Sequence, residues 1–273
     1  MGWFEALVLG VVQGITEFLP ISSTAHLLII SQLFGWKDPG AAYSAVVQIG
    51  TEIAVLIYFR REIGAIVSAW FRSLTDKAAR HDPNARMGWL IIVGTIPVAV
   101  LGLIFKDQIE TVARNLYLVA TMLIVFGLIL GVADALGARR KTEQDITVRD
   151  GLIYGLAQAF ALIPGVSRSG ATISAGRAMG YTRAAAARYA FLLAVPAVLL
   201  SGLFEARKIG SEQVSWGPTL LSTVVAFAVG YAVIAWLLRW LMSRSYLPFV
   251  IYRVALGAVV LVLLGVGVLH SGS

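Results

Sequence analysis

The stretch FLPISSTAH, residues 18–26, places a proline, three hydroxyl side chains and a histidine inside an otherwise apolar segment. The apolar flank on each side is about a dozen residues long, which is too short to cross a bilayer that requires roughly 20 helical residues. Polar backbone at membrane depth is tolerated only where protein buries it or water reaches it. We therefore predict that residues 3–34 form a re-entrant helical hairpin, broken at Pro20 to Thr24.

The rest of the sequence is typical of a polytopic membrane protein. Hydrophobic residues make up 58% of the 273 residues and charged residues only 14%, with a mean hydropathy of +0.81, which argues against a soluble domain. The N-terminus lacks the basic and small-residue features of a removable signal peptide, so we expect it to belong to the fold. Six apolar runs are long enough to span a bilayer, near residues 43–59, 89–105, 116–135, 186–206, 218–238 and 249–269.

Composition also excludes several functions. With no cysteine, the chain has no disulfide, thiolate nucleophile or thiolate metal site. The net charge of +7 comes mostly from loops between apolar runs, and not from a basic groove with aromatic platforms. We therefore expect no nucleic-acid partner.

A second interrupted segment resembles the first. Residues 151–179 are broken at Pro164 to Gly170, and GLAQ (155–158) precedes that break as GVVQ (10–13) precedes the first. Two polar tips at membrane depth imply a cavity between them. We expect this segment to form a second re-entrant hairpin.

A weaker similarity relates YLVA (117–120) to YRVA (252–255). We use these internal similarities to divide the chain into two repeats, 1–136 and 150–273. The polar loop GARRKTEQDITVRD joins them within a single membrane domain. Each repeat contains one hairpin and three spans, and three is odd, so the second repeat is inverted relative to the first. The predicted fold is all-α and polytopic, with six transmembrane helices, two re-entrant helical hairpins and inverted-topology repeats.

Loop charges orient this arrangement, because cytoplasmic loops carry an excess of Lys and Arg. Twelve such residues fall on one side: Arg60, Arg61, Arg72, Lys77, Arg80, Arg86, Arg139, Arg140, Lys141, Arg149, Arg239 and Arg244. Five fall on the other: Lys37, Lys106, Arg114, Arg207 and Lys208. Both termini and the first hairpin are then predicted to enter from the extracytoplasmic side.

The second break, PGVSRSGAT at 164–172, has the composition of an anion cradle. Arg168 offers a planar fork of donors suited to phosphate, and intramembrane ionisable residues are functional candidates. Glycines permit close backbone approach, and hydroxyls with helix N-terminal amides donate to phosphate oxygens; these are Gly165, Gly170, Ser167, Ser169 and Thr172. The alternative is that Arg168 pairs with Glu17 or Glu52 to hold the hairpins together, and both interpretations can be true.

The first break has the groups of an activated nucleophile. Gln13 and Glu17, four residues apart, share a helix face directed toward the break. The break and the following half-helix supply hydroxyls and an imidazole from Ser22, Ser23, Thr24 and His26. A hydroxyl, an imidazole and a carboxylate can form a nucleophile with its acid/base partner. Helix capping and backbone hydrogen bonding by the hydroxyls are the alternative.

Glu52, with Gln48 one turn before it, places a carboxylate near the middle of a predicted span. It could pair with Arg168 or Arg188, join two helices as a protonated acid, or handle a metal ion or protons. The sequence leaves these roles open. We treat Gln48 and Glu52 as accessory site residues.

Together these residues resemble a known family, the bacterial undecaprenyl-pyrophosphate phosphatases associated with bacitracin resistance. Its first motif is a Glu or Gln ahead of a Glu that leads into an SST and His run, and its second is PGxSRSxxT. Here they stand as QGITE with FLPISSTAH, and as PGVSRSGAT. The resemblance covers essentially the whole chain.

The resemblance implies a multi-pass enzyme of the bacterial plasma (inner) membrane that cleaves a polyprenyl pyrophosphate lipid to the monophosphate carrier and phosphate, for peptidoglycan synthesis. It implies that the catalytic residues are Glu17, Ser23, His26 and Arg168. Around them, as substrate-binding residues, it places Gln13, Ser22, Thr24, Gly165, Ser167, Ser169, Gly170 and Thr172. Family members are often described as requiring a divalent cation, Mg²⁺ or Ca²⁺. Many have Glu where this chain has Gln13, so the sequence leaves the cation optional.

Three functional hypotheses follow. In the first, Ser23 attacks the terminal phosphorus while His26 or Glu17 accepts its proton, or water attacks directly. The second is a transporter that flips a polyprenyl phosphate through the inverted-repeat cavity, with Glu52 coupling protons. A purely structural scaffold would leave both polar breaks unexplained. The expected partners are the lipid substrate and membrane lipids, and the sequence leaves a homodimer open.

Overall fold

The computed structural model describes residues 1–38, 40–112, 114–206 and 215–271. Within these ranges the chain is helical and contains no β-strand beyond one isolated bridge. The elements are α1 (Trp3–Phe18), α2 (Ser23–Leu33), α3 (Gly40–Tyr58), α4 (Arg60–Thr75), η1 (Ala78–His81), α5 (Pro83–Ile104), α6 (Lys106–Val112), α7 (Leu116–Leu136), η2 (Glu143–Asp145), α8 (Val148–Phe160), α9 (Arg168–Ala178), α10 (Arg183–Ala206), α11 (Trp216–Leu241) and α12 (Leu247–Gly265). The predicted all-α polytopic fold is confirmed.

Five helices, α5, α7, α10, α11 and α12, are long and apolar enough to cross a membrane. A sixth span is obtained if α3 and α4 are counted as one, but they are bent by 79° where they meet. The charge count treated residues 60–88 as a loop between two spans, and this interpretation is wrong, because residues 60–75 form helix α4. That helix buries Ile66 and Ala69 while Phe71 remains exposed, so its arginines belong to an amphipathic helix.

The two predicted hairpins have the same local geometry. α1 and α2 are separated by residues 19–22, and α8 and α9 by residues 161–167. Each second helix begins after a serine in the left-handed region, Ser22 at φ 73° and Ser167 at φ 72°. Each serine Oγ accepts from the backbone amide three residues later, at 3.5 Å from Ala25 N and 3.2 Å from Gly170 N. These caps satisfy amides that would otherwise be unpaired inside the molecule.

Helix packing repeats the same correspondence. α1 packs on α11, and α8 packs on α5, while α7 packs on α12. Gly10 and Gly155 each precede their capping serine by twelve residues. A Cβ on Gly10 would meet the carbonyl of Ser222 at 2.8 Å, and one on Gly155 would collide with the carbonyl of Gly94. Small residues therefore let each hairpin approach the backbone of its partner helix closely.

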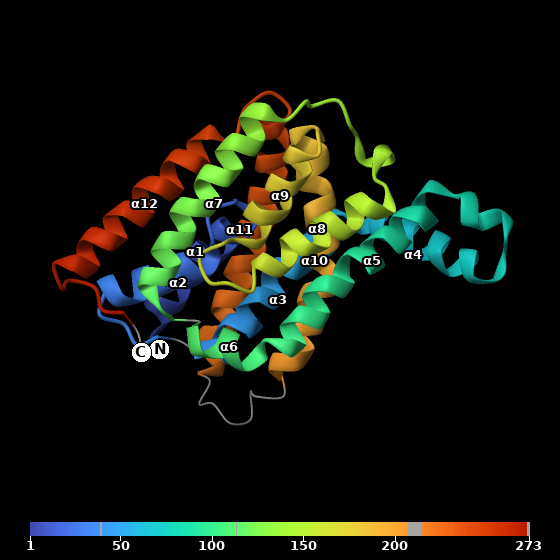
Figure 1. Ribbon diagram of the computed structural model, residues 1–273. Coiled ribbons are helices and arrows are strands. Elements are labelled where there is room, and N and C mark those ends of the chain that lie inside the picture. The colour runs from blue at the N-terminus through green and yellow to red at the C-terminus, as the bar shows by residue number, and fades with distance from the viewer. Residues whose placement is uncertain (39, 113, 207–214, 272–273) are drawn as a thin grey trace.

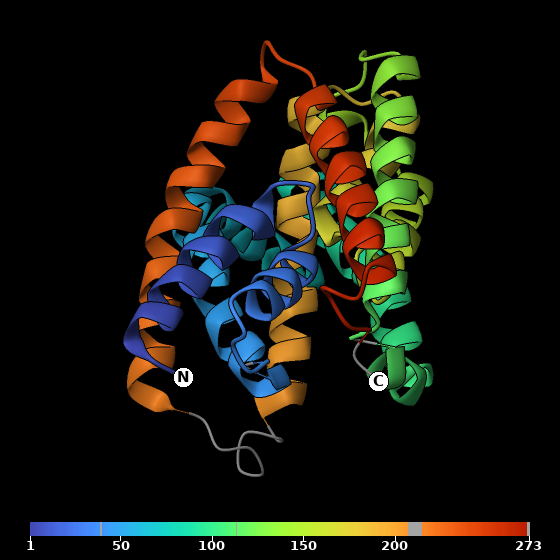
Figure 2. The ribbon, with the colours of Figure 1, turned by 90° about the vertical axis from the view of Figure 1, so that its left-hand side faces the viewer.

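The two ends of the molecule carry different features. Both termini and α6 lie at one end, and the loop after α7 and the turn between α11 and α12 lie at the other (Figure 1 and Figure 2). The first break is buried between them, because Phe18, Leu19 and Ile21 belong to a hydrophobic core with residues of α10, α11 and α12. Arg207 and Lys208, which entered the charge count, lie outside the described residues.

We predict that Gly155→Ala destabilises the protein. The added methyl would collide with the Gly94 backbone, and overpacking of this kind costs about 1–3 kcal/mol, more than alanine gains in helix propensity. Gly102→Ala on α5 is the control, because its Cβ would lie 3.8 Å from Leu162, an ordinary contact. The thermal unfolding midpoint in detergent should fall for the first variant only. Equal midpoints would contradict the close packing of α8 on α5.

Candidate active site

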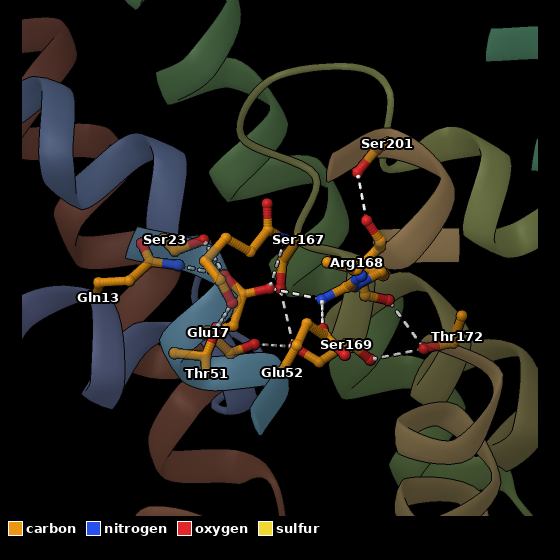
Figure 3. A network of polar contacts seen from close by, with 12 residues as sticks. Gln13, Glu17, Ser23, Thr51, Glu52, Ser167, Arg168, Ser169, Thr172 and Ser201 are labelled. Atoms are coloured by element: carbon orange, nitrogen blue, oxygen red, sulfur yellow. Dashed lines mark hydrogen bonds and ion pairs between the residues drawn. The ribbon is translucent and has the colours of Figure 1, made fainter. Parts of the chain in front are cut away.

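The Glu17 carboxylate, near the end of α1, is the centre of a polar network between the hairpins (Figure 3). Its Oε2 accepts from Gln13 Nε2 at 2.9 Å and from Ser23 Oγ at 2.7 Å. Its Oε1 accepts from Arg168 Nη2 at 2.6 Å and from Gln48 Nε2 at 3.3 Å. The side chain is only 6% exposed. One carboxylate therefore connects the hydroxyl of the first hairpin to the guanidinium of the second.

Arg168 is the first residue of α9. Its Nη2 lies 2.6 Å from Glu17 Oε1 and 3.4 Å from Glu52 Oε1, so the ion pairs considered as an alternative from the sequence are both formed. The side chain is nevertheless 19% exposed, unlike its two carboxylate partners. A helix N-terminus favours anions, and Arg168 presents a charged donor at such a terminus.

A cavity of about 380 Å³ lies between the two breaks. The predicted site residues that line it are Gln13, Glu17, Ser22, Ser23, Thr24, Gln48, Gly165, Ser167 and Arg168. The cavity thus meets the N-terminal turns of both α2 and α9, where amides and hydroxyls can donate hydrogen bonds. Such a donor set suits an anion with several oxygens.

Three residues of the second motif act in the framework around this cavity. Ser169 Oγ donates to Leu19 O at 3.1 Å, which joins the two breaks. Thr172 Oγ1 donates to Arg168 O at 2.8 Å, and the Gly170 amide donates to the capping serine. None of the three is among the residues that line the cavity.

Glu52 lies beside the network and is 3% exposed. Its partner is Arg168 and not Arg188, whose guanidinium contacts Glu62 at 2.6 Å and Glu143 at 3.2 Å. Glu52 Oε2 has no hydrogen-bond partner among the described residues. It therefore contributes a second carboxyl group next to the arginine, in a small pocket beside the main cavity.

His26 is bound by residues other than Ser23 and is not among the residues that line the cavity. Its Nδ1 lies 2.7 Å from Ser22 O and its Nε2 2.7 Å from the Tyr252 hydroxyl, and its ring stacks on Tyr252. A carbonyl oxygen can only accept, so Nδ1 donates to Ser22 O, and when the ring is neutral Nε2 accepts from the Tyr252 hydroxyl. Both ring nitrogens are thus engaged, and the hydrogen bonds favour Glu17 over His26 as the proton acceptor for Ser23.

Arg253, on α12, was assigned no role from the sequence but contacts both breaks. Its Nη1 donates to Pro20 O at 3.0 Å, and its Nη2 donates to Gly165 O at 3.1 Å and Val166 O at 2.9 Å. Its Nε donates to Leu123 O at 3.2 Å, and the side chain is fully buried. The sequence feature that could have predicted a role for Arg253 is its position as a lone cation inside the apolar run 249–269.

The carboxylates do not form a metal site by themselves. In the part of the chain that the structure describes, no group of three or more His, Asp or Glu side chains could hold a metal ion. Glu17 and Glu52 both face Arg168, which neutralises the oxygens that Mg²⁺ or Ca²⁺ would need. The protein residues therefore do not fit a closed set of cation ligands.

The fold and the site together define a class of protein. It is a polytopic helical membrane protein with a cavity at which an arginine and a serine bind the same carboxylate. The family model for bacitracin resistance protein BacA matches residues 6–259. The chain is 62% identical to "Undecaprenyl-diphosphatase 2" of Streptomyces coelicolor, covering 98% of this chain and 97% of that protein. It is 60% identical to "Undecaprenyl-diphosphatase" of Streptomyces griseus (100% and 99%) and 58% to that of Micrococcus luteus (99% and 100%). The chain belongs to the BacA family.

We predict that Arg253→Met lowers stability sharply. Methionine keeps most of the side-chain volume but leaves several buried carbonyls without a donor, and each lost partner costs about 1–3 kcal/mol. The unfolding midpoint should fall, and a single Cys placed in either break should become more reactive to thiol reagents. As the control, Arg239→Met removes an arginine in the last turn of α11 that contacts neither break. Unchanged stability in Arg253→Met would show that the carbonyls find other donors.

Proposed function

We propose that this protein is a membrane phosphatase that hydrolyses undecaprenyl pyrophosphate to undecaprenyl phosphate and inorganic phosphate, and so returns the lipid carrier to cell-wall synthesis. The observation that carries the proposal is that Ser23 and Arg168, from different hairpins, bind the same Glu17 carboxylate at the cavity. The names of its relatives support the substrate class.

Phosphate binding would activate Ser23 by changing the partner of Arg168. The terminal phosphate would take over the Arg168 guanidinium from Glu17, and the serine hydroxyls and helix N-terminal amides would bind its other oxygens. Glu17 would then be free to accept the Ser23 proton. The serine oxygen would bond to the terminal phosphorus as the bond to the bridging oxygen breaks, which releases the polyprenyl monophosphate.

Once Glu17 has passed the Ser23 proton to the departing monophosphate or to solvent, water would attack the phosphoserine phosphorus. Glu17 would accept a proton from that water and return it to the Ser23 oxygen as the Oγ–P bond breaks, which releases inorganic phosphate and regenerates the hydroxyl. The same geometry also permits water, bound where Ser23 meets Glu17, to attack the lipid pyrophosphate directly. The two routes differ in whether the Ser23 oxygen becomes covalently bound to phosphorus.

We predict that the purified protein releases phosphate from a polyprenyl pyrophosphate in detergent, where no second compartment exists, so that release requires hydrolysis. Ser23→Ala should lose far more turnover than Ser22→Ala, because of these two serines Ser23 is the one that donates to Glu17. Ser22 caps α2, so its loss should cost about 1 kcal/mol of stability. If Ser23→Ala turns over like the wild type, covalent catalysis is excluded and direct water attack is favoured.

We also propose that the two halves are inverted repeats and that the cavity opens to the extracytoplasmic side. The matched serine caps, Gly10 and Gly155, and the exchanged helix partners support the repeats. The end of the molecule that carries the loop after α7 holds Arg139, Arg140 and Lys141, which supports a cytoplasmic location for that end.

Native cysteine is absent, which makes the orientation testable. Lys37 and Arg140 are both exposed and belong to opposite sides in the charge count. A Lys37→Cys variant should react with a membrane-impermeant thiol reagent in intact cells, and Arg140→Cys should react only after permeabilisation. The reverse pattern would overturn the proposed orientation.

A further inference from the structure

Gln158 is a buried amide at the cavity that the reaction described above does not use. It lies near the end of α8, lines the cavity together with Glu17 and Arg168, and is 1% exposed. Neither its Nε2 nor its Oε1 has a hydrogen-bond partner among the described residues. Buried polar groups are almost always paired, and an unpaired one is costly, so this amide requires a physical explanation.

The equivalent residue in the first hairpin shows why Gln158 lacks a partner. Gln13 precedes its capping serine by nine residues, and Gln158 precedes Ser167 by nine. Gln13 donates to Glu17, four residues later, but the residue four positions after Gln158 is Leu162. The second hairpin therefore keeps the amide but replaces its acceptor by an apolar side chain that also lines the cavity.

An incoming anion can supply the missing acceptor. Pyrophosphate oxygens accept hydrogen bonds, and a neutral amide can donate to them without the repulsion that a second carboxylate would exert. Only Nε2 is suitable, because a fully ionised pyrophosphate has no proton to donate to Oε1. A hydrogen bond from Nε2 formed only with substrate would recover part of the cost of burying the amide unpaired.

We propose that Gln158 is a substrate-binding residue whose Nε2 donates to a non-bridging pyrophosphate oxygen of the lipid held by Arg168. This assignment rests on the proposed phosphatase function and adds a binding group from α8. It also explains why a glutamine is buried where an apolar residue would pack more favourably in the empty cavity.

Two substitutions and one matched control test this role. Gln158→Leu keeps a similar volume and removes the amide, and Gln158→Glu keeps the shape but places a carboxylate at the cavity. Thr219→Val is the control, because Thr219 is fully buried with an unpartnered Oγ1 but is not among the cavity-lining residues. For each protein, kcat and KM are measured with a polyprenyl pyrophosphate in detergent, and the unfolding midpoint is measured without substrate.

We expect Gln158→Leu to raise KM by about ten- to hundredfold, which corresponds to one hydrogen bond to a charged group. The midpoint should not fall, since no native hydrogen bond is removed. Gln158→Glu should raise KM at least as much, and Thr219→Val should leave both constants unchanged. Wild-type KM in Gln158→Leu would overturn the assignment, as would a loss of activity that parallels a loss of stability.

A second measurement separates this inference from the proposed function. Inorganic pyrophosphate should raise the unfolding midpoint of the wild type by binding the folded state, and Gln158→Leu should weaken that rise. If the wild type binds pyrophosphate through Gln158 but releases no phosphate from the lipid, the phosphatase proposal fails and the binding role stands. If pyrophosphate does not shift the wild type, or shifts both proteins equally, the binding role fails.

Discussion

Two interruptions of helix in the interior of a membrane protein require that their backbone groups find partners without bulk water, and the rest of this structure depends on that constraint. The amides are satisfied by Ser22 and Ser167, which cap the helices that follow. The carbonyls are satisfied by Arg253, which donates to both breaks at once. A buried guanidinium thus connects two hairpin tips that are far apart in the sequence, and Ser169, which donates to Leu19 O, joins them as well.

The ion pairs of Arg168 leave its guanidinium accessible to an anion. Desolvation of two buried charges offsets much of their attraction, so these ion pairs add little net stability. Glu17 and Glu52 instead hold an arginine that is still partly open to the cavity. An anion that takes this arginine leaves Glu17 as a buried carboxylate without its cation, and such a carboxylate gains by accepting a proton. In the proposed mechanism the same exchange releases the carboxylate that holds Ser23, and substrate binding would thereby activate the nucleophile.

Sequence reasoning predicted the two breaks and nine of the residues that line the cavity, because polar clusters in apolar runs are rare and costly. It missed helix α4 and the role of Arg253 for identifiable physical reasons, and it did not predict the partners of His26. α4 was taken as a loop because its arginines masked an amphipathic period. His26 was grouped with Ser23 by proximity in sequence, although Tyr252, from α12, holds its ring. Arg253 gave a signal as an intramembrane cation, but its partners are carbonyls, which no sequence pattern reveals.

The correspondence between the hairpins extends to the residues that we propose act on the substrate. Ser23 and Arg168 each follow directly after a capping serine, and Gln13 and Gln158 each precede one by nine residues. The same backbone position therefore presents a hydroxyl in one hairpin and a guanidinium in the other, aimed at one cavity. Glu17 has no counterpart, since Leu162 stands in its place. In the proposed mechanism this difference gives the hairpins one base, where two matched carboxylates would repel a pyrophosphate, and it leaves Gln158 available to bind substrate.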